Sequence, residues 1–175
     1  MDRPEQAQFR HAVLAELSAV HRLAVYLCRS RDRADDLVQE TYLRVFRSAS
    51  TYRPSEHGPR PWLFKILHNV WRSKAGRQLE VSTSADELAE HLPASEPAST
   101  ELDWENVDER VKRAVEMLPD NYRDVLLLWA VEELKYRQIA EITGVPIGTV
   151  MSRLFRARQM LADALADVAV ERGLS

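Results

Sequence analysis

Three arginines stand close together in the segment GVPIGTVMSRLFRAR, residues 144–158, which contains no acidic residue. At about 100° per residue in a helix, four polar residues share one arc of about 100°: Thr149, Ser152, Arg153 and Arg156. Arginines bind duplex DNA by displacing the counterions condensed on its phosphates, and a bidentate arginine can read guanine. The arc therefore predicts contact with duplex DNA, whereas a basic helix face that only meets solvent is the alternative.

A second candidate binding segment is the helix WLFKILHNVWRSKAGR, residues 62–77, in which aromatic rings alternate with basic and amide side chains. Single-stranded nucleic acid is held by rings that stack on bases and by cations along the backbone. The segment follows a loop rich in Pro, Gly and Ser over residues 48–61. It predicts a surface for unpaired DNA. Packing in the protein core is the alternative for Trp62 and Trp71.

The arginine arc is preceded by a pattern typical of a helix-turn-helix. Ile139 and Ile142 mark a short helix, and the small Ala140 lets the next helix cross closely. Gly144 is suited to the left-handed backbone of the turn. The apolar contacts of the second helix are then Val145, Val150 and Leu154. In this motif the second helix enters the major groove with its N-terminal residues against base edges, so the pattern favours DNA binding over a solvated face.

The rest of the chain predicts an all-α fold, because runs of alternating Val, Ile and Thr are rare and apolar residues recur at helical spacing. One helix is expected from about Pro4 to Arg29, and another begins near Asp32 as its N-cap. The second of these has one apolar face, comprising Leu37, Val38, Thr41, Tyr42 and Val45. Four further helical segments are expected after residue 103, and Asp120 or Asn121 is expected to cap the second of them.

Charge divides the chain into three parts although the net charge is only −3. Lys and Arg outnumber Asp and Glu by 14 to 8 over residues 1–79, are outnumbered 12 to 3 over 80–120, and balance at 7 each over 121–175. The stretch 79–103 is rich in Ser, Thr, Pro, Ala and acids without an apolar stripe. We expect two small helical domains, residues 1–79 and 104–175, joined by an acidic flexible linker over 80–103.

Several function classes find no support in the sequence. It has no phosphate-binding Gly-Lys loop, paired-Cys metal motif, zinc-protease motif or nucleophile elbow, so we expect neither catalysis nor a cofactor. His21 and Cys28 lie seven apart on an apolar stripe, where a packed pair is expected rather than a metal site. No apolar run approaches the roughly 20 residues of a membrane span, and the N-terminus lacks a signal-peptide pattern. A cytoplasmic protein is expected.

Two long segments resemble one protein family. DDLVQETYLRVFRSASTYRPSEHGPRPWLFKILHNVWRSKAGR is similar to the N-terminal domain of bacterial sigma factors of the extracytoplasmic-function (ECF) group, and LPDNYRDVLLLWAVEELKYRQIAEITGVPIGTVMSRLFRARQML is similar to their C-terminal domain. The likeness spans nearly the whole chain in the right order. It implies a specificity subunit of RNA polymerase with no catalytic site of its own.

The resemblance also implies partners and roles. The partners are core RNA polymerase, through the clamp helices of its largest subunit and its flap, promoter DNA, and an anti-sigma factor. Polymerase binding falls to Asp36, Gln39, Glu40 and Leu43. Melting and reading of the minus-10 element falls to Tyr52, Trp62, Lys65, Asn69, Arg72 and Ser73. Reading of the minus-35 element falls to Thr149, Ser152, Arg153, Arg156 and Arg158.

Three positions depart from the family pattern: Met151 replaces a common lysine, Gln138 a common glutamate, and Ser73 a frequent asparagine. They leave open which promoter bases are read. Two other functions also remain open. A dimeric DNA-binding regulator would bind a palindrome by itself, whereas a sigma factor needs core polymerase for specific binding. A helical adaptor that binds only proteins would not need Arg153 and Arg156 for nucleic-acid binding.

Overall fold

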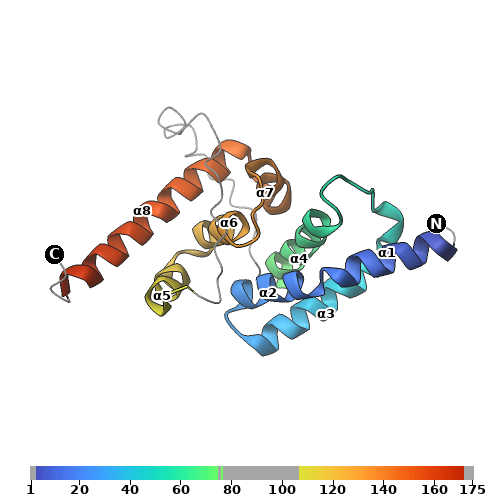
Figure 1. Cartoon of the computed structure of the whole chain (residues 1–175), viewed down its shortest axis with the longest axis horizontal. Helices are drawn as coiled ribbons and strands as arrows, with labels where there is room; N and C mark the ends of the chain where they lie inside the picture. The colour runs from blue at the N-terminus through green and yellow to red at the C-terminus, as the bar shows by residue number, and fades with distance from the viewer. Residues whose placement is uncertain (1–2, 75, 77–106, 172–175) are drawn as a thin grey trace. The chain divides into compact units, whose positions relative to one another are not determined.

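The computed structural model describes residues 3–74, 76 and 107–171, and all regular structure within these ranges is helical (Figure 1). This confirms the all-α prediction. The helices fall into two compact units, in which α1 to α4 pack together and α5, α6 and α8 pack together. Their bounds are α1 Arg3–Ala15, α2 Leu17–Cys28, α3 Arg31–Arg47, the short 3-10 helix η1 Ala49–Thr51, α4 Arg60–Lys74, α5 Glu109–Met117, α6 Asp120–Ala130, α7 Tyr136–Thr143 and α8 Ile147–Glu171.

The first unit is built on α2, α3 and α4, each of which packs on the other two. Its core contains fully buried side chains from all three helices, among them Leu23, Leu37, Leu63 and Leu67. Burying one such side chain contributes about 1.5–3 kcal/mol, against about 0.2–1 kcal/mol for an exposed ion pair. Apolar packing therefore fixes the relation of α3 to α4, the two helices that carry the predicted polymerase and minus-10 residues.

The single helix expected from Pro4 to Arg29 is divided in the structure. α1 ends at Ala15 and α2 begins at Leu17, with Glu16 between them. Neither Gly nor Pro marks this break in the sequence. α2 ends where Arg29 adopts the left-handed conformation, with φ 53°, and its amide donates to the Val25 carbonyl.

Two expected N-caps are also wrong. α3 begins at Arg31 with Ser30 as N-cap, so Asp32 lies in the first turn, where its carboxylate faces the positive end of the helix dipole. α6 begins at Asp120 directly after Pro119. The Asp120 carboxylate pairs with the Arg123 guanidinium at 2.8 Å rather than capping the helix.

The second unit packs α5 and α6 against the long helix α8. The Asp108 side chain caps α5 by accepting from the Arg110 amide at 2.8 Å. Leu127, Leu128 and Leu154 are among its fully buried residues. The acidic linker expected over 80–103 lies outside the described residues. None of the helices in the described ranges combines the length and the apolar character needed to cross a bilayer.

Candidate nucleic-acid interface

The predicted helix-turn-helix is formed by α7, a short turn and α8. Gly144 occupies the turn with φ 72°, in the left-handed region expected for it. Ile139 and Ile142 of α7 are fully buried, as is Val150 of α8. The three side chains are therefore buried, as their spacing predicted, and α8 is the second helix of the motif.

Gln138, one of the departures from the family pattern, has a structural role at the start of α7. Its side-chain oxygen accepts from the Lys135 amide at 2.9 Å, immediately before the helix begins. This is the return bond of a capping box, in which the third helical residue satisfies the amide of the N-cap. A glutamate at this position makes the same bond, so the exchange preserves the helix start.

The polar arc on α8 separates into exposed and buried members. Arg156 is exposed and Arg153 is half-buried, whereas Thr149 and Ser152 are buried. Ser152 Oγ donates to the Thr149 carbonyl at 3.1 Å within the helix. Thus the guanidinium groups, rather than the hydroxyls, carry most of the polar surface of the arc.

Arg158 has a different environment from the other arginines of α8. Its guanidinium carbon lies 4.2 Å from the centroid of the Trp129 ring of α6. This is a cation–π geometry, which joins α8 to α6. The Trp129 side chain itself is half-buried.

α4 has one buried and one accessible face. Its buried side comprises Leu63, Phe64, Leu67, His68, Val70 and Trp71. Lys65, Asn69 and Ser73 are exposed at four-residue intervals, and Trp62 and Arg72 are half-buried beside them. The residues predicted to meet unpaired DNA therefore share a face of α4. Trp71 packs on His68 at 5.4 Å between ring centroids, as the core-packing alternative held for it.

Tyr52 and Trp62 lie together in an aromatic cluster. Their ring centroids are 5.1 Å apart, and the Phe9 ring of α1 lies 5.4 Å from Tyr52 and 6.1 Å from Trp62. Partial burial raises the pKa of Tyr52 above its usual value. Both rings remain half-buried, and each therefore keeps a surface open to solvent.

The predicted polymerase-binding residues lie on α3. Asp36, Gln39 and Leu43 are exposed, and Glu40 is half-buried. Arg44 Nε donates to Glu40 at 2.9 Å, and this bond holds the pKa of Glu40 below its usual range. The opposite face of α3 is buried at every position that the apolar pattern predicted.

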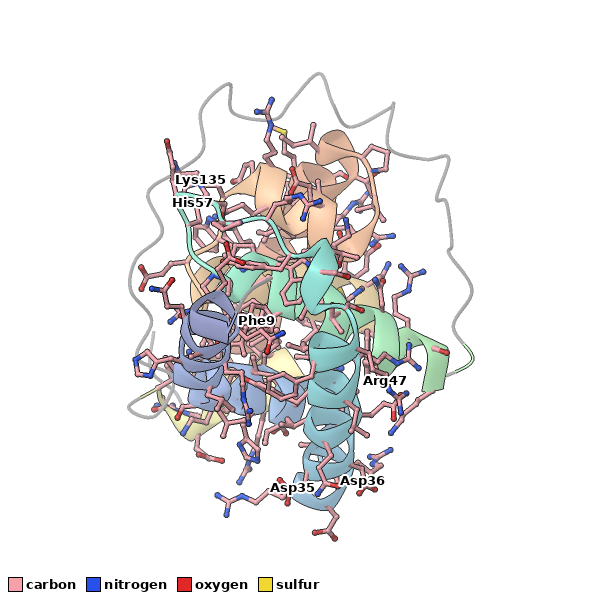
Figure 2. All side chains as sticks on the ribbon, turned by 90° about the vertical axis from the view of Figure 1, so that its right-hand side faces the viewer. Phe9, Asp35, Asp36, Arg47, His57 and Lys135 are labelled. Atoms are coloured by element: carbon pink, nitrogen blue, oxygen red, sulfur yellow. The ribbon has the colours of Figure 1, made fainter. Side chains whose placement is uncertain are left out.

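The exposed side of α3 combines apolar and charged groups. Leu43 is 53% exposed and Phe46 is 41% exposed. Figure 2 shows Asp35 and Asp36 at the N-terminal end of the helix and Arg47 at its C-terminal end. Acids at the start and bases at the end both match the helix dipole.

Three features of the first unit were not expected from the sequence. Phe9 of α1 is buried, four residues before the fully buried Val13, and so belongs to the apolar side of the helix. Glu16 accepts from Arg60 at 2.6 Å, a contact between residues 44 apart that no local pattern indicates. His21, expected in a packed pair with Cys28, is partly exposed and its Nε2 lies 2.9 Å from Asp35 Oδ1.

The chain matches known proteins along most of its length. Residues 12–78 match the family model described as Sigma-70 region 2, and residues 108–161 match that described as Sigma-70, region 4. The ECF RNA polymerase sigma factor EcfG of Rhodopseudomonas palustris is 33% identical over 163 residues, which cover 93% of this chain and 87% of that protein. The ECF RNA polymerase sigma factor SigE of Mycolicibacterium smegmatis is 31% identical over 176 residues, covering 99% of this chain and 68% of that protein.

Among solved structures, the sigma factor RpoE of Bartonella quintana, crystallised in complex with the anti-sigma factor NepR, is similar in fold. Its TM-score is 0.68 at 28% identity, and the match covers 91% of this chain and 97% of that one.

Proposed function

The chain belongs to the ECF sigma factors, which direct bacterial RNA polymerase in transcription initiation, and we propose that it selects promoters through two DNA-binding surfaces. One surface is the α8 side of the helix-turn-helix, and the other is the accessible face of α4 with its preceding loop. We assign them to residues 104–175 and 1–79 respectively. The observation that supports the proposal is that each unit presents exposed basic side chains, Lys65 on α4 and Arg156 on α8, within the residues that match Sigma-70 regions 2 and 4.

The helix-turn-helix would read the minus-35 element as duplex DNA. Arg156 and Arg153 supply the cations that contact phosphate or guanine, and Thr149 and Ser152 line the start of the same arc. Arg158 contributes mainly by holding α8 on Trp129. The absence of acidic side chains from residues 144–158 keeps the approaching phosphates free of repulsion.

The accessible face of α4 would hold the minus-10 element as unpaired DNA. Lys65 and Arg72 can follow the phosphates, Asn69 and Ser73 can bond to base edges, and Tyr52 with Trp62 offers stacking surfaces. Extruding one base costs a few kcal/mol, which such contacts can offset without a hydrolysis step. The protein therefore needs no catalytic centre of its own to open the promoter.

Binding of core polymerase would use the exposed side of α3. Asp36, Gln39 and Glu40 supply polar contacts around the apolar Leu43. We propose that the clamp helices of the largest subunit dock here, and that the flap meets the second unit. The assembly would act in the cytoplasm, where the polymerase is.

An anti-sigma factor would regulate the protein by covering surfaces that polymerase or DNA needs. The structural relative from Bartonella quintana was crystallised with one. By analogy, we propose that this chain is held inactive by a protein partner until a signal releases it.

The experiment that tests the function is transcription in vitro with core polymerase, genomic DNA and the purified chain, followed by mapping of start sites. We expect new start sites that share a minus-35 and a minus-10 element at fixed spacing. If the chain bound the same elements specifically without core polymerase, it would act as a separate regulator. If start sites were unchanged by its addition, the proposal would be wrong.

A further inference from the structure

α1 contacts the loop between η1 and α4 near its beginning. Phe9 is only 5% exposed, and its ring packs on Tyr52 as well as on Trp62 at the start of α4. Phe46 of α3 closes the cluster, with its centroid 6.5 Å from that of Phe9. Figure 2 shows Phe9 directed inward from α1 and His57 out on the loop.

A polar contact fixes the other end of the same loop. Glu16, at the break between α1 and α2, accepts from Arg60 Nε at 2.6 Å. The Glu16 side chain is 20% exposed and that of Arg60 is 41% exposed, so the pair is partly shielded from water. Arg60 is the first residue of α4. The loop is thus tied to the α1 segment at both of its ends, by unlike interactions.

The middle of the loop lacks such support and faces solvent. Residues 53–57 are all exposed. Their local order comes from a tight turn, in which the Gly58 amide donates to the Ser55 carbonyl at 3.1 Å and Gly58 has φ 65°. A loop that is held at both ends and exposed in its middle can present the side chains of residues 53–57 to a ligand.

We infer that α1 and the residue that follows it fix this loop for promoter opening, with Phe9 and Glu16 as the positioning residues. Phe9 precedes residue 12, where the match to the Sigma-70 region 2 family model begins, so that model does not include it. The inference rests on the proposed function of the loop and α4 at the minus-10 element. Neither residue is assigned a contact with DNA.

The physical reason is the entropy of ordering. A loop that must become ordered when DNA binds loses conformational freedom at that moment, and this cost is subtracted from the energy available to hold an extruded base. If α1 orders the loop in the free protein, this loss of entropy occurs during folding and does not weaken DNA binding. Loss of Phe9 should therefore slow opening of duplex DNA, while binding to core polymerase and to the minus-35 element stays intact.

The test uses holoenzyme assembled from core polymerase and the full-length chain, on a promoter mapped in the transcription experiment above. The variant is Phe9→Leu, which keeps an apolar side chain and removes the ring. Its control is Val13→Ala, because Val13 is fully buried one turn further along α1 and the hydroxyl of Tyr42 donates to its backbone carbonyl, which the substitution retains. Opening is followed by permanganate reactivity on the duplex promoter and on the same promoter with a mismatched minus-10 segment.

We expect Phe9→Leu to open the duplex promoter about tenfold more slowly, since one aromatic pair is worth about one decade in rate. On the mismatched promoter, where unpairing is already done, its defect should fall to about twofold or less. Val13→Ala should open the duplex within about twofold of the unchanged chain. Equal defects for the two variants, or a Phe9→Leu defect of the same size on both templates, would overturn the inference.

A second measurement does not depend on DNA. Amide hydrogen exchange on the free chain should show faster exchange at Tyr52 and Gly58 in Phe9→Leu but not in Val13→Ala. Unchanged exchange would overturn the inference even if opening were slow. Should Phe9→Leu not fold, Glu16→Gln takes its place, with an expected loss of about twofold in duplex opening and none on the mismatched promoter. If the unchanged chain itself supports no initiation, it is the proposed function that fails, and the exchange result still decides whether α1 orders the loop.

Discussion

Arg156 and Arg158 stand two residues apart on α8, yet the structure gives them different tasks. Arg156 is exposed on the arc that we assign to the minus-35 element, and Arg158 lies on the Trp129 ring. Replacing each by alanine removes the same charge. Because their surroundings differ, we expect Arg156→Ala to weaken DNA binding and Arg158→Ala to lower stability.

The magnitude for Arg156→Ala follows from counterion release. Each phosphate contact contributes about 0.9 to the slope of log affinity against log salt, so a fourfold rise in salt weakens binding about 3.5-fold per contact. Arg156→Ala should lower that slope by about one contact and leave thermal stability unchanged. Arg158→Ala should leave the slope nearly unchanged. It should instead remove a cation–π contact of about 0.5–1 kcal/mol, which lowers the melting temperature by about 2–8 °C in a unit of this size.

The assay is fluorescence anisotropy of holoenzyme on a labelled promoter duplex at several salt concentrations between about 50 and 200 mM. Arg113→Ala is the matched control, because Arg113 is an exposed arginine of the same unit on α5, outside the helix-turn-helix. A slope that falls equally for Arg158→Ala and Arg156→Ala would refute the division of roles. So would an Arg156→Ala slope equal to that of the control.

Three other predictions concern the turn, the polymerase surface and a buried tyrosine. Gly144→Ala should destabilise the protein by about 1–2 kcal/mol, because φ is 72° at this residue, and the cost is backbone strain alone since no atom lies within 4 Å of the added methyl group. Gly148→Ala, also unobstructed but without a positive φ, should not lower the melting temperature. Leu43→Ser should weaken binding to core polymerase about fivefold in a titration, because Leu43 is 53% exposed and about half of its burial energy is still available for binding. Met117→Ser, at a residue 85% exposed on the other unit, should leave that affinity unchanged. Burial raises the pKa of Tyr42 from 10.0 to about 12, so the neutral form is favoured in the folded state; the free energy of unfolding should fall as pH rises from 10 to 12, and Tyr42→Phe should flatten that fall in pH-dependent melting curves.

Features set by neighbouring residues could be predicted from the sequence. The buried face of α3 follows from apolar residues at helical spacing, and the left-handed Gly144 follows from a glycine between two apolar-periodic segments. In both cases the cause lies within one or two helical turns of the residue concerned. The accessible face of α4 was predictable for the same reason.

Features set by contacts across the fold could not be predicted. Phe9 meets Tyr52 and Trp62 only because α1 packs beside the loop, and nothing in the local pattern of residues 3–15 specifies that neighbour. The place of Arg158 depends on Trp129 of another helix. Thr149 and Ser152 are polar residues of a type that often contacts DNA, yet both are buried. Their burial depends on the packing around the start of α8, which their spacing in the sequence does not indicate.

In the first unit, the proposed polymerase surface on α3 and the proposed DNA surface on α4 rest on one shared core. The exposed side of α3 and the accessible face of α4 both stand on helices whose buried sides meet around Leu37 and Leu67. A change in that core moves both helices, so it must affect polymerase binding and promoter opening together. Substitutions at Leu43 or Asn69 alter one surface without changing the packing beneath it. The two activities are therefore separable only by substitutions at the surface.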